Sequence, residues 1–424
     1  MFRHSFLIAG FAVISQILGI LRDRMLAHYV GIGPALDIYN ASFRLPDLAL
    51  GMLLAFASAG TVVPFIAKAI KDNNQSELEE RFNSLFFFFG GVMVVLCLLL
   101  AAILPLLVHI LVPGFTAEQV AQYIPLTRIL LMQPVLLGLS ALISCLAQAR
   151  HEFLLYSIAP LLYTVVIMAS IVGLYPSFGI VGIIFGVVVG AALHLGFQSF
   201  TLIKHPIRVH HVHASLKYVR EHLKISVPRS GSLIISQLRV IFFTAAATTL
   251  GAGALSVYVF AQKITDAIVS IVAQSFSTGS LPLLSSQLAG GDVLSYKRTL
   301  KHNILFIFSA TVGAALFCYF FAPLVVHALY GNTGSNEEIV RLLKVMLVGM
   351  PFFAVAWYLT YAFSAMKDTM PPLYSNAIST SAAIAVLFWA RAEGYGLLSI
   401  GLSVITVNIV SILVLGFIYT RKKL

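Results

Sequence analysis

The chain has 424 residues, of which 59% are hydrophobic and only 10% are charged, and its mean hydropathy is +0.95. This composition excludes a soluble globular protein of ordinary type and predicts a polytopic membrane protein. The net charge of +11 does not call for a nucleic-acid partner, because the Lys and Arg excess of cytoplasmic loops gives the same sign.

Apolar runs, separated by turn residues and charges, predict about twelve membrane-spanning helices. Each run can cross a hydrocarbon layer of ~30 Å at ~1.5 Å per residue. The first run has no small-residue cleavage site, so we interpret it as a retained helix rather than a signal peptide. The predicted spans are 5–30, 35–66, 82–112, 121–148, 153–174, 178–203, 226–250, 254–287, 302–330, 338–365, 371–390 and 396–420.

Lysines and arginines gather in alternate loops along the chain. The basic loops lie at 68–81, 150, 204–224, 297–301, 367 and 421–423. The intervening loops hold almost none, with Arg391 as the main exception. By the positive-inside tendency, we expect the basic loops and both termini in the cytoplasm.

The segment 204–225 is the long polar stretch of the sequence. Its apolar residues recur at spacings of four, three and four from Val212 to Leu223, which predicts an amphipathic helix on the cytoplasmic membrane surface. Its four histidines could hold a metal ion. Because no carboxylate or cysteine is grouped with them, we favour interfacial, partly protonatable histidines.

This segment separates two halves that resemble each other. The sequence Pro105-Leu-Leu-Val-His109 recurs as Pro323-Leu-Val-Val-His327, an offset of 218 residues. Since about six spans separate equivalent points, the halves are parallel repeats. We therefore predict an all-α fold of two six-helix lobes around a central cavity. The predicted parts are an N-lobe (1–203), a linker helix (204–225) and a C-lobe (226–424).

Several charged residues fall inside the predicted spans, where each costs roughly 2.5–3.5 kcal/mol if it faces lipid. They must therefore face a wet cavity or pair with one another, and a basic cavity suggests an anionic substrate. The candidate residues are Arg22, Asp23, Arg24, Asp37, Arg44, Arg239, Lys263 and Asp266.

The local setting of these charges leaves alternatives open. Lys263 and Asp266 lie one turn apart, so a neutral structural pair is the alternative to a role in transport. Arg239 is expected to face the cavity or to reach Asp266. Pro46 predicts a bend in the second span, which is either a hinge or a structural kink.

No enzyme signature is present in the sequence, which lacks a Walker loop, a GxSxG elbow and an HExxH helix. We therefore expect no enzyme and no bound cofactor. Without a nucleotide site, an ion gradient, the membrane potential or the substrate gradient must supply the energy. The three cysteines lie in separate spans without metal-like spacing, and we interpret them as packing residues.

One stretch, from residue 15 to residue 65, carries a family resemblance. Its relevant parts are Leu18-Gly19-Ile20-Leu21-Arg22-Asp23, Asp37, Arg44-Leu45-Pro46-Asp47 and Val63-Pro64, with Pro113-Gly114-Phe115, Pro282 and Lys367-Asp368-Thr369 further on. These residues resemble the MurJ (MviN) family of lipid II flippases in the MOP exporter superfamily. The resemblance implies a protein of the bacterial cytoplasmic (inner) membrane that flips a lipid-linked cell-wall precursor outward by alternating access. We expect a monomer, because nothing in the sequence suggests an obligate partner.

By this resemblance, charged residues of the first two spans line the cavity, and Lys263 stands where the family usually has arginine. Arg22, Arg44 and Lys263, with Arg239 as a further candidate, would bind the substrate diphosphate. Asp23, Asp37 and Asp266 would orient these cations and relay opening.

Family members have also been linked to a sodium site in the C-terminal lobe. Asn376 and Thr380 share one helical face and could contribute to such a site. Either Na⁺ or H⁺ is the expected coupling ion.

The sequence departs from the family pattern at several places. The family often has arginine where Gln16 stands, many members have an arginine pair at Leu50-Gly51, and a glutamate at Ala55. Such members continue for two helices that house the lipid tail, whereas we interpret Leu424 as a natural cytoplasmic end. Three alternatives stay open: an exporter of another lipid-linked oligosaccharide, a MOP-type cation-coupled antiporter, and a transport-inactive scaffold.

Overall fold

The computed structural model describes residues 2–57, 59–150, 152–209 and 215–422. Within these ranges the regular secondary structure is helical throughout, as predicted for an all-α membrane protein. The chain forms two compact units, Met1–Gln237 and Leu238–Leu424. The boundary falls inside one helix, whereas the sequence analysis placed the linker at 204–225.

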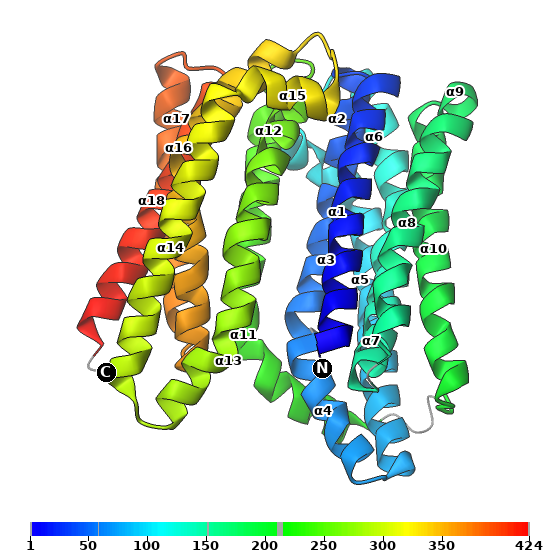
Figure 1. Ribbon diagram of the computed structural model, residues 1–424. Helices are drawn as coiled ribbons and strands as arrows, with labels where there is room; N and C mark the ends of the chain where they lie inside the picture. The colour runs from blue at the N-terminus through cyan, green and yellow to red at the C-terminus, as the bar shows by residue number, and fades with distance from the viewer. Residues whose placement is uncertain (1, 58, 151, 210–214, 423–424) are drawn as a thin grey trace. The chain divides into compact units, whose positions relative to one another are not determined.

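The first unit contains ten helices and the beginning of an eleventh (Figure 1). They are α1 (Phe2–Tyr29), α2 (Pro34–Ser42), α3 (Arg44–Phe56), α4 (Ala59–Lys71), α5 (Gln75–Leu111), α6 (Ala117–Leu130), α7 (Met132–Ala149), α8 (Phe153–Gly173), α9 (Tyr175–Phe178), α10 (Ile180–Lys204) and α11 (Leu216–Thr248). The predicted second span is thus divided among α2, α3 and α4. The first break lies at Phe43 rather than at Pro46, because proline is tolerated in the first turn of a helix.

Three glycines bring α10 against α8 in the first unit. Gly182, Gly186 and Gly190 recur every fourth residue and therefore lie on one face of α10. A Cβ atom at Gly186 would lie 2.1 Å from the Ser170 hydroxyl oxygen, and one at Gly182 would lie 2.7 Å from the backbone oxygen of Leu174, the residue directly after α8. Small residues at this spacing let two helix backbones approach closely in a membrane.

The second unit contains the end of α11 and seven further α-helices, with one π-helical turn. These are α12 (Ala254–Val269), the π turn η2 (Ser270–Gln274), α13 (Ser275–Ala289), α14 (Val293–Phe320), α15 (Ala322–Tyr330), α16 (Asn336–Ala365), α17 (Met370–Ala392) and α18 (Leu398–Arg421). Helix α16 lies at the centre of this unit and packs against α12, α14 and α18.

Helix packing repeats from one unit to the other. In the first unit α10 packs against α7 and α8, and α5 packs against α7. In the second unit α18 packs against α16 and α17, and α14 packs against α16. The order of helices and their partners therefore agrees with the internal repeat that the sequence predicts.

A carboxylate–lysine contact occurs at the same place in each unit. Glu152, before α8, accepts a hydrogen bond from Lys204 at the end of α10, with 2.7 Å between the atoms. Asp368, before α17, forms an ion pair with Lys422 after the end of α18. Both contacts join the start of one helix to the end of its packing partner.

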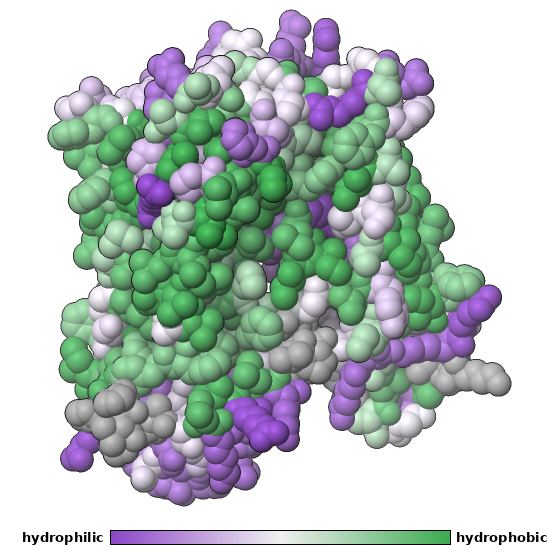
Figure 2. All heavy atoms as spheres, turned by 180° about the vertical axis from the view of Figure 1, so that it is seen from behind, coloured by the Kyte–Doolittle hydropathy of each residue, from purple (hydrophilic) through white to green (hydrophobic). Residues whose placement is uncertain are grey.

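Ten helices in the described ranges are long and apolar enough to cross a membrane, or eleven if the bent pair Pro34–Phe56 and Thr61–Lys71 is one span. Helices or groups of helices cover each of the twelve predicted spans, with α1, of 28 residues, over the first. On the face seen in Figure 2, hydrophobic side chains cover the middle of the helices and hydrophilic ones gather toward their ends. This pattern fits helices whose outer surface meets lipid.

The linker differs from the expected separate surface helix. Residues 210–214, with three of its histidines, lie outside the described residues, and from Leu216 onward the segment is the beginning of α11. Val219 and His222 are buried in the first unit. In the described part of the chain, no group of three or more metal-binding side chains occurs.

Candidate functional site

An ion pair on α1 holds the first candidate cation. The guanidinium of Arg22 lies 3.0 Å from the carboxylate of Asp23, and the two side chains are 25% and 9% exposed. Tyr39 of α2 and Tyr163 of α8 lie within electrostatic range of Arg22, and Asp47 of α3 lies within range of both tyrosines. Four helices thus bring polar groups together around one partly exposed guanidinium.

The other candidates of the first unit lie in different settings. Asp37 is buried on α2, whereas Arg44 is half-buried at the first residue of α3, so the break at Phe43 puts them on separate helices. The Nε atom of Arg44 is buried and has no hydrogen-bond partner among the described residues. Arg24 is exposed on α1. A buried guanidinium nitrogen without an acceptor is costly unless a ligand or water supplies one.

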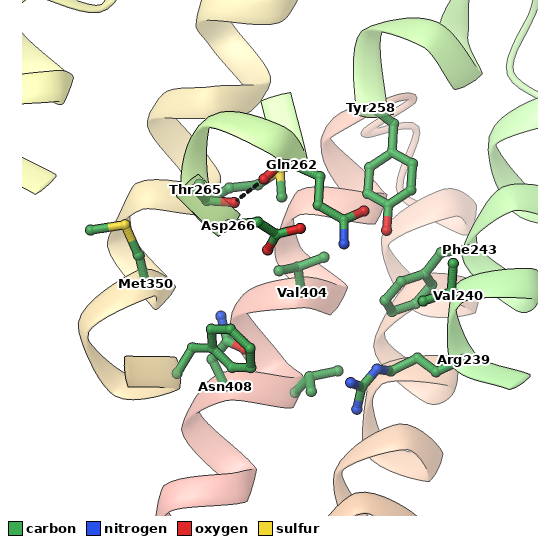
Figure 3. Close-up of a pocket in the computed structure, with 13 residues that line it drawn as sticks. Arg239, Val240, Phe243, Tyr258, Gln262, Thr265, Asp266, Met350, Val404 and Asn408 are labelled. Carbon is green, nitrogen blue, oxygen red and sulfur yellow. Dashed lines mark hydrogen bonds between the residues drawn. The ribbon is translucent and has the colours of Figure 1, made fainter. Parts of the chain in front are cut away.

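A pocket lies within the second unit, between α11, α12, α16 and α18 (Figure 3). The empty space between its side chains, including the part open to solvent, is about 560 Å³. Its polar lining residues are Arg239, Tyr258, Gln262, Thr265, Asp266 and Asn408, and its apolar lining residues are Val240, Phe243, Met346, Met350, Phe353, Val404 and Val407.

Arg239 and Asp266 enter this pocket from α11 and α12. Arg239 donates a hydrogen bond to the side-chain oxygen of Asn376 on α17, at 3.4 Å. Asp266 is exposed to the pocket, receives a hydrogen bond from Gln262 one turn earlier, and has no salt bridge among the described residues. The pocket therefore holds one cation and one carboxylate that are not paired with each other by a salt bridge.

Lys263 does not line the pocket, although it is three residues from Asp266. Its ammonium nitrogen lies 5.9 Å from the centre of the Phe260 ring. Lys263 and Asp266 thus differ in setting, because only Asp266 lines the pocket, and the paired arrangement stays an alternative.

The two predicted ion ligands lie on α17. The side-chain oxygen of Asn376 already accepts from Arg239, and the hydroxyl oxygen of Thr380 is buried without a partner among the described residues. Hard cations favour carboxylate and other oxygen ligands, and a guanidinium next to Asn376 repels a second cation. A sodium site at Asn376 and Thr380 stays a prediction, which the neighbouring guanidinium of Arg239 disfavours.

Sequence reasoning missed several polar neighbours of the charged residues. Tyr39 and Tyr163 approach Arg22, and Tyr258 and Asn408 line the pocket with Asp266. Each is an uncharged residue within a long apolar helix, so neither charge nor periodicity distinguishes it. The glycines of α10 offered a usable signal, because their spacing of four residues marks the face of α10 that packs against α8. Tyr163 of α8 lies against Gly190 on that face.

Two units of membrane-length helices with repeated packing, and with charged side chains inside the spans, define a multi-pass membrane transporter. A family model described as "Lipid II flippase MurJ" matches residues 26–424. The chain belongs to the MurJ family of lipid II flippases, and the predicted family is confirmed.

Curated relatives agree with this assignment. A probable lipid II flippase MurJ of Rhizobium tropici is 22% identical over 414 residues, covering 91% of this chain and 75% of the relative. The lipid II flippase MurJ of Burkholderia cenocepacia is 23% identical over 392 residues, covering 88% of this chain and 75% of the relative. This chain thus spans about three quarters of their length.

Solved structures confirm the fold. A lipid II flippase MurJ in an inward closed conformation matches with a TM-score of 0.83 at 18% identity, covering 98% of this chain and 88% of that one. An inward-facing multidrug resistance MATE family transporter of the MOP superfamily matches with a TM-score of 0.81 at 15% identity, covering 96% and 94%. This chain therefore shares the fold of both transporters.

Proposed function

We propose that this protein translocates lipid II, a lipid-linked peptidoglycan precursor, across the bacterial cytoplasmic membrane by alternating access. The observation that carries the proposal is the match of the flippase family model to residues 26–424. The charged side chains inside the spans support it, because the substrate carries a diphosphate and the membrane interior otherwise disfavours charge.

The cations provide the proposed diphosphate site. In the first unit Arg22 and Arg44 are the proposed phosphate ligands, and in the second unit Lys263 is proposed, with Arg239 as a further contact. Arg22 is held in place by Asp23, and its exposed fraction of 25% leaves part of the guanidinium open to a ligand. The planar guanidinium of arginine can donate two parallel N–H hydrogen bonds to a phosphate, so the exposed part of the Arg22 guanidinium suits this ligand.

The carboxylates have a proposed role in orienting these cations. Asp23 holds the guanidinium of Arg22 directly, and Asp37 is buried on the following helix. Asp266 would act in the second unit, where it shares a pocket with Arg239. In this proposal an incoming diphosphate takes the place of the carboxylate as the partner of the cation. The helices that carry the carboxylate and the cation can then rearrange, which links substrate binding to the conformational change.

The expected topology completes the proposal. Both termini and the basic loops lie in the cytoplasm, so the head group enters from that side and leaves on the other. Membrane lipids surround a monomer. Between the two expected coupling ions, the guanidinium beside Asn376 favours H⁺ over Na⁺.

Complementation tests the proposal. A bacterium depleted of its own lipid II flippase should grow when it expresses this protein, and growth should be lost with Arg44→Ala. Arg128→Ala is the matched control, because Arg128 is exposed and donates to the backbone oxygen of Ala101. Membrane insertion of each variant is checked by immunoblot. Rescue by Arg44→Ala at equal expression would remove Arg44 from the proposed site.

A cation-coupled antiporter of the MATE type is the second candidate. The similarity to a MATE transporter, with a TM-score of 0.81, favours it as far as the fold is concerned. A carboxylate in the pocket of the second unit is the feature that such an antiporter would use. Drug resistance conferred on an efflux-deficient host, without rescue of flippase depletion, would select this candidate.

A further inference from the structure

The helix break after α3 leaves a carbonyl that must find a partner outside its helix. Helix α3 ends at Phe56, and the axes of Pro34–Phe56 and Thr61–Lys71 are bent by 43°. The last carbonyls of a helix have no intrahelical donor. The carbonyl oxygen of Phe56 instead accepts from the Nε2 atom of His222, at 2.9 Å, and from the hydroxyl of Thr61, at 3.5 Å.

The imidazole that caps this carbonyl is enclosed by aromatic rings. His222 is 0% exposed. The ring of Phe65 on α4 lies edge-on at 5.4 Å between centroids, and the ring of Phe89 on α5 lies edge-on at 5.8 Å. Because a carbonyl can only accept, Nε2 carries the proton. The other nitrogen, Nδ1, is buried and has no hydrogen-bond partner among the described residues.

An arginine of α5 reinforces the same junction. Arg81 donates to the carbonyl oxygen of Phe65 at 3.0 Å, and its guanidinium lies 4.6 Å from the Phe65 ring and 4.9 Å from the Tyr218 ring. Glu77 holds this guanidinium from one turn earlier, at 2.7 Å. Arg81 thus connects α4 to the first turn of α11.

The start of α11 is fastened to the first unit by backbone contacts as well. Ser84 of α5 accepts from the backbone N–H of Ser215, at 2.7 Å. Asn83 donates to the backbone oxygen of Arg208, at 2.8 Å. Helix α11 then runs without interruption to Thr248, beyond the boundary between the two units at Gln237.

We propose that His222 is a proton-sensitive latch that fixes the α3–α4 bend to α11, the helix that continues into the second unit. The neutral ring closes the latch by donating to Phe56. A protonated ring would keep its Nε2–H but would bury a charge and a second, unsatisfied N–H donor among apolar rings, so protonation destabilises the closed latch through desolvation. The latch is a property of this fold and does not depend on which lipid the protein carries.

The main compensation that the surroundings of His222 offer for a positive charge is the carbonyl of Phe56, and burial of the ring outweighs it. Helices α3 and α4 present the Phe56 carbonyl and the Phe65 ring, and α5 presents the Phe89 ring. The charged groups around the neighbouring Tyr218 are Arg81, Glu77 and Glu80 of α5 and Glu221 of α11, and no described carboxylate bonds to the imidazole. Burial accordingly lowers the pKa of His222 from its ordinary value.

The sign of the pH effect follows from this lowered pKa. A histidine whose folded pKa lies below its unfolded pKa stabilises the fold fully above the unfolded value, near ~6.5. That contribution is lost as the pH falls through the folded pKa. We therefore expect the latch closed at pH 7.5 and weakened at pH 5.5.

Hydrogen exchange read by mass spectrometry tests the latch on the purified full-length protein. We expect peptides that cover residues 56–66 to exchange faster at pH 5.5 than at pH 7.5, by up to about tenfold after correction for intrinsic rates. His222→Gln keeps an N–H donor but cannot be protonated in this range, so its protection should be independent of pH. His222→Phe keeps the ring without the donor and should exchange fast at both pH values.

His205→Gln is the matched control, because His205 bonds to Glu152 rather than to the helix break. It should respond to pH as the unmodified protein does. Equal protection of the unmodified protein at both pH values would overturn the proposal, as would a His222→Gln variant that follows the unmodified protein. The readout involves no substrate, so it is independent of the success or failure of the flippase proposal.

Discussion

Arg22 and Asp23 are neighbours in sequence, and the structure uses this adjacency to hold a guanidinium in place. Both Nε and Nη2 of Arg22 donate to one oxygen of Asp23, at 3.2 and 3.0 Å. The sequence predicted that these two charges had to pair or face water. It did not predict Tyr39 and Tyr163, because a tyrosine in an apolar helix carries no charge signal.

Asp23→Asn tests the importance of this pair at the scale of one residue. Loss of the carboxylate charge leaves a partly buried guanidinium without its counter-ion, so we expect the free energy of unfolding to fall by about 1–3 kcal/mol. Thermal unfolding in detergent measures the effect. Asp72→Asn, at an exposed position after α4, is the control, and a variant at Asp23 no less stable than this control would contradict the account.

For single helices, the positions of breaks and junctions are what the sequence could not predict. The second span was expected to bend at Pro46, but the helix breaks at Phe43 and again after Phe56. At the second break, a buried partner, His222, lies 166 residues from Phe56 and satisfies its carbonyl. No local pattern reveals such a long-range contact, and the same contacts make the linker part of α11.

Close packing of α8 and α10 gives a sharp prediction at the same scale. Gly186→Val should destabilise the first unit by about 1–3 kcal/mol, because its Cβ would meet the Ser170 side chain at 2.1 Å and force the helices apart. Gly196→Val on the same helix is the control, since nothing lies within 4 Å of its Cβ position. Unfolding curves of equal midpoint for both variants would refute the packing argument.

The contact between Glu152 and Lys204 should make the junction of α8 and α10 sensitive to acid. The hydrogen bond from Lys204 lowers the pKa of Glu152 below its ordinary value. Its stabilising effect is therefore complete above the unfolded pKa and is lost as the pH falls through the lowered pKa. We expect Glu152→Gln to reduce stability at pH 7 by less than ~1 kcal/mol, as for exposed ion pairs.

Melting curves between pH 7 and pH 3 check this expectation. The stability difference between the unmodified protein and Glu152→Gln should shrink as the pH falls. A difference that stays constant across this range would show that the carboxylate charge does not contribute.

The internal repeat organises the whole molecule and was the part most accessible from sequence. Matched motifs such as Pro105 and Pro323 predicted two parallel halves, and helix packing repeats accordingly. The repeated carboxylate–lysine contacts, through Lys204 and Lys422, follow nearly the same offset as the repeat but were not anticipated, because a sequence repeat does not show which loop residues touch. Fold class and family followed from sequence, whereas the placement of polar groups required coordinates.

Ion dependence is a prediction for the molecule as a whole. Because Arg239 lies beside Asn376, we expect the melting temperature to be the same in NaCl and in choline chloride at equal ionic strength. Arg239→Lys should behave likewise, since it keeps the charge. Sodium-specific stabilisation that disappears in Asn376→Ala would show that a sodium site forms despite the guanidinium.

The central claim is that this chain moves a lipid-linked diphosphate across the membrane with cations placed inside its spans. The most direct measurement is the translocation of labelled lipid II in proteoliposomes that contain the purified protein. We predict translocation by the unmodified protein and by Arg128→Ala, and a loss of at least about tenfold in Arg44→Ala. Absence of translocation by well-folded, unmodified protein, under an imposed proton gradient and membrane potential, would contradict the account.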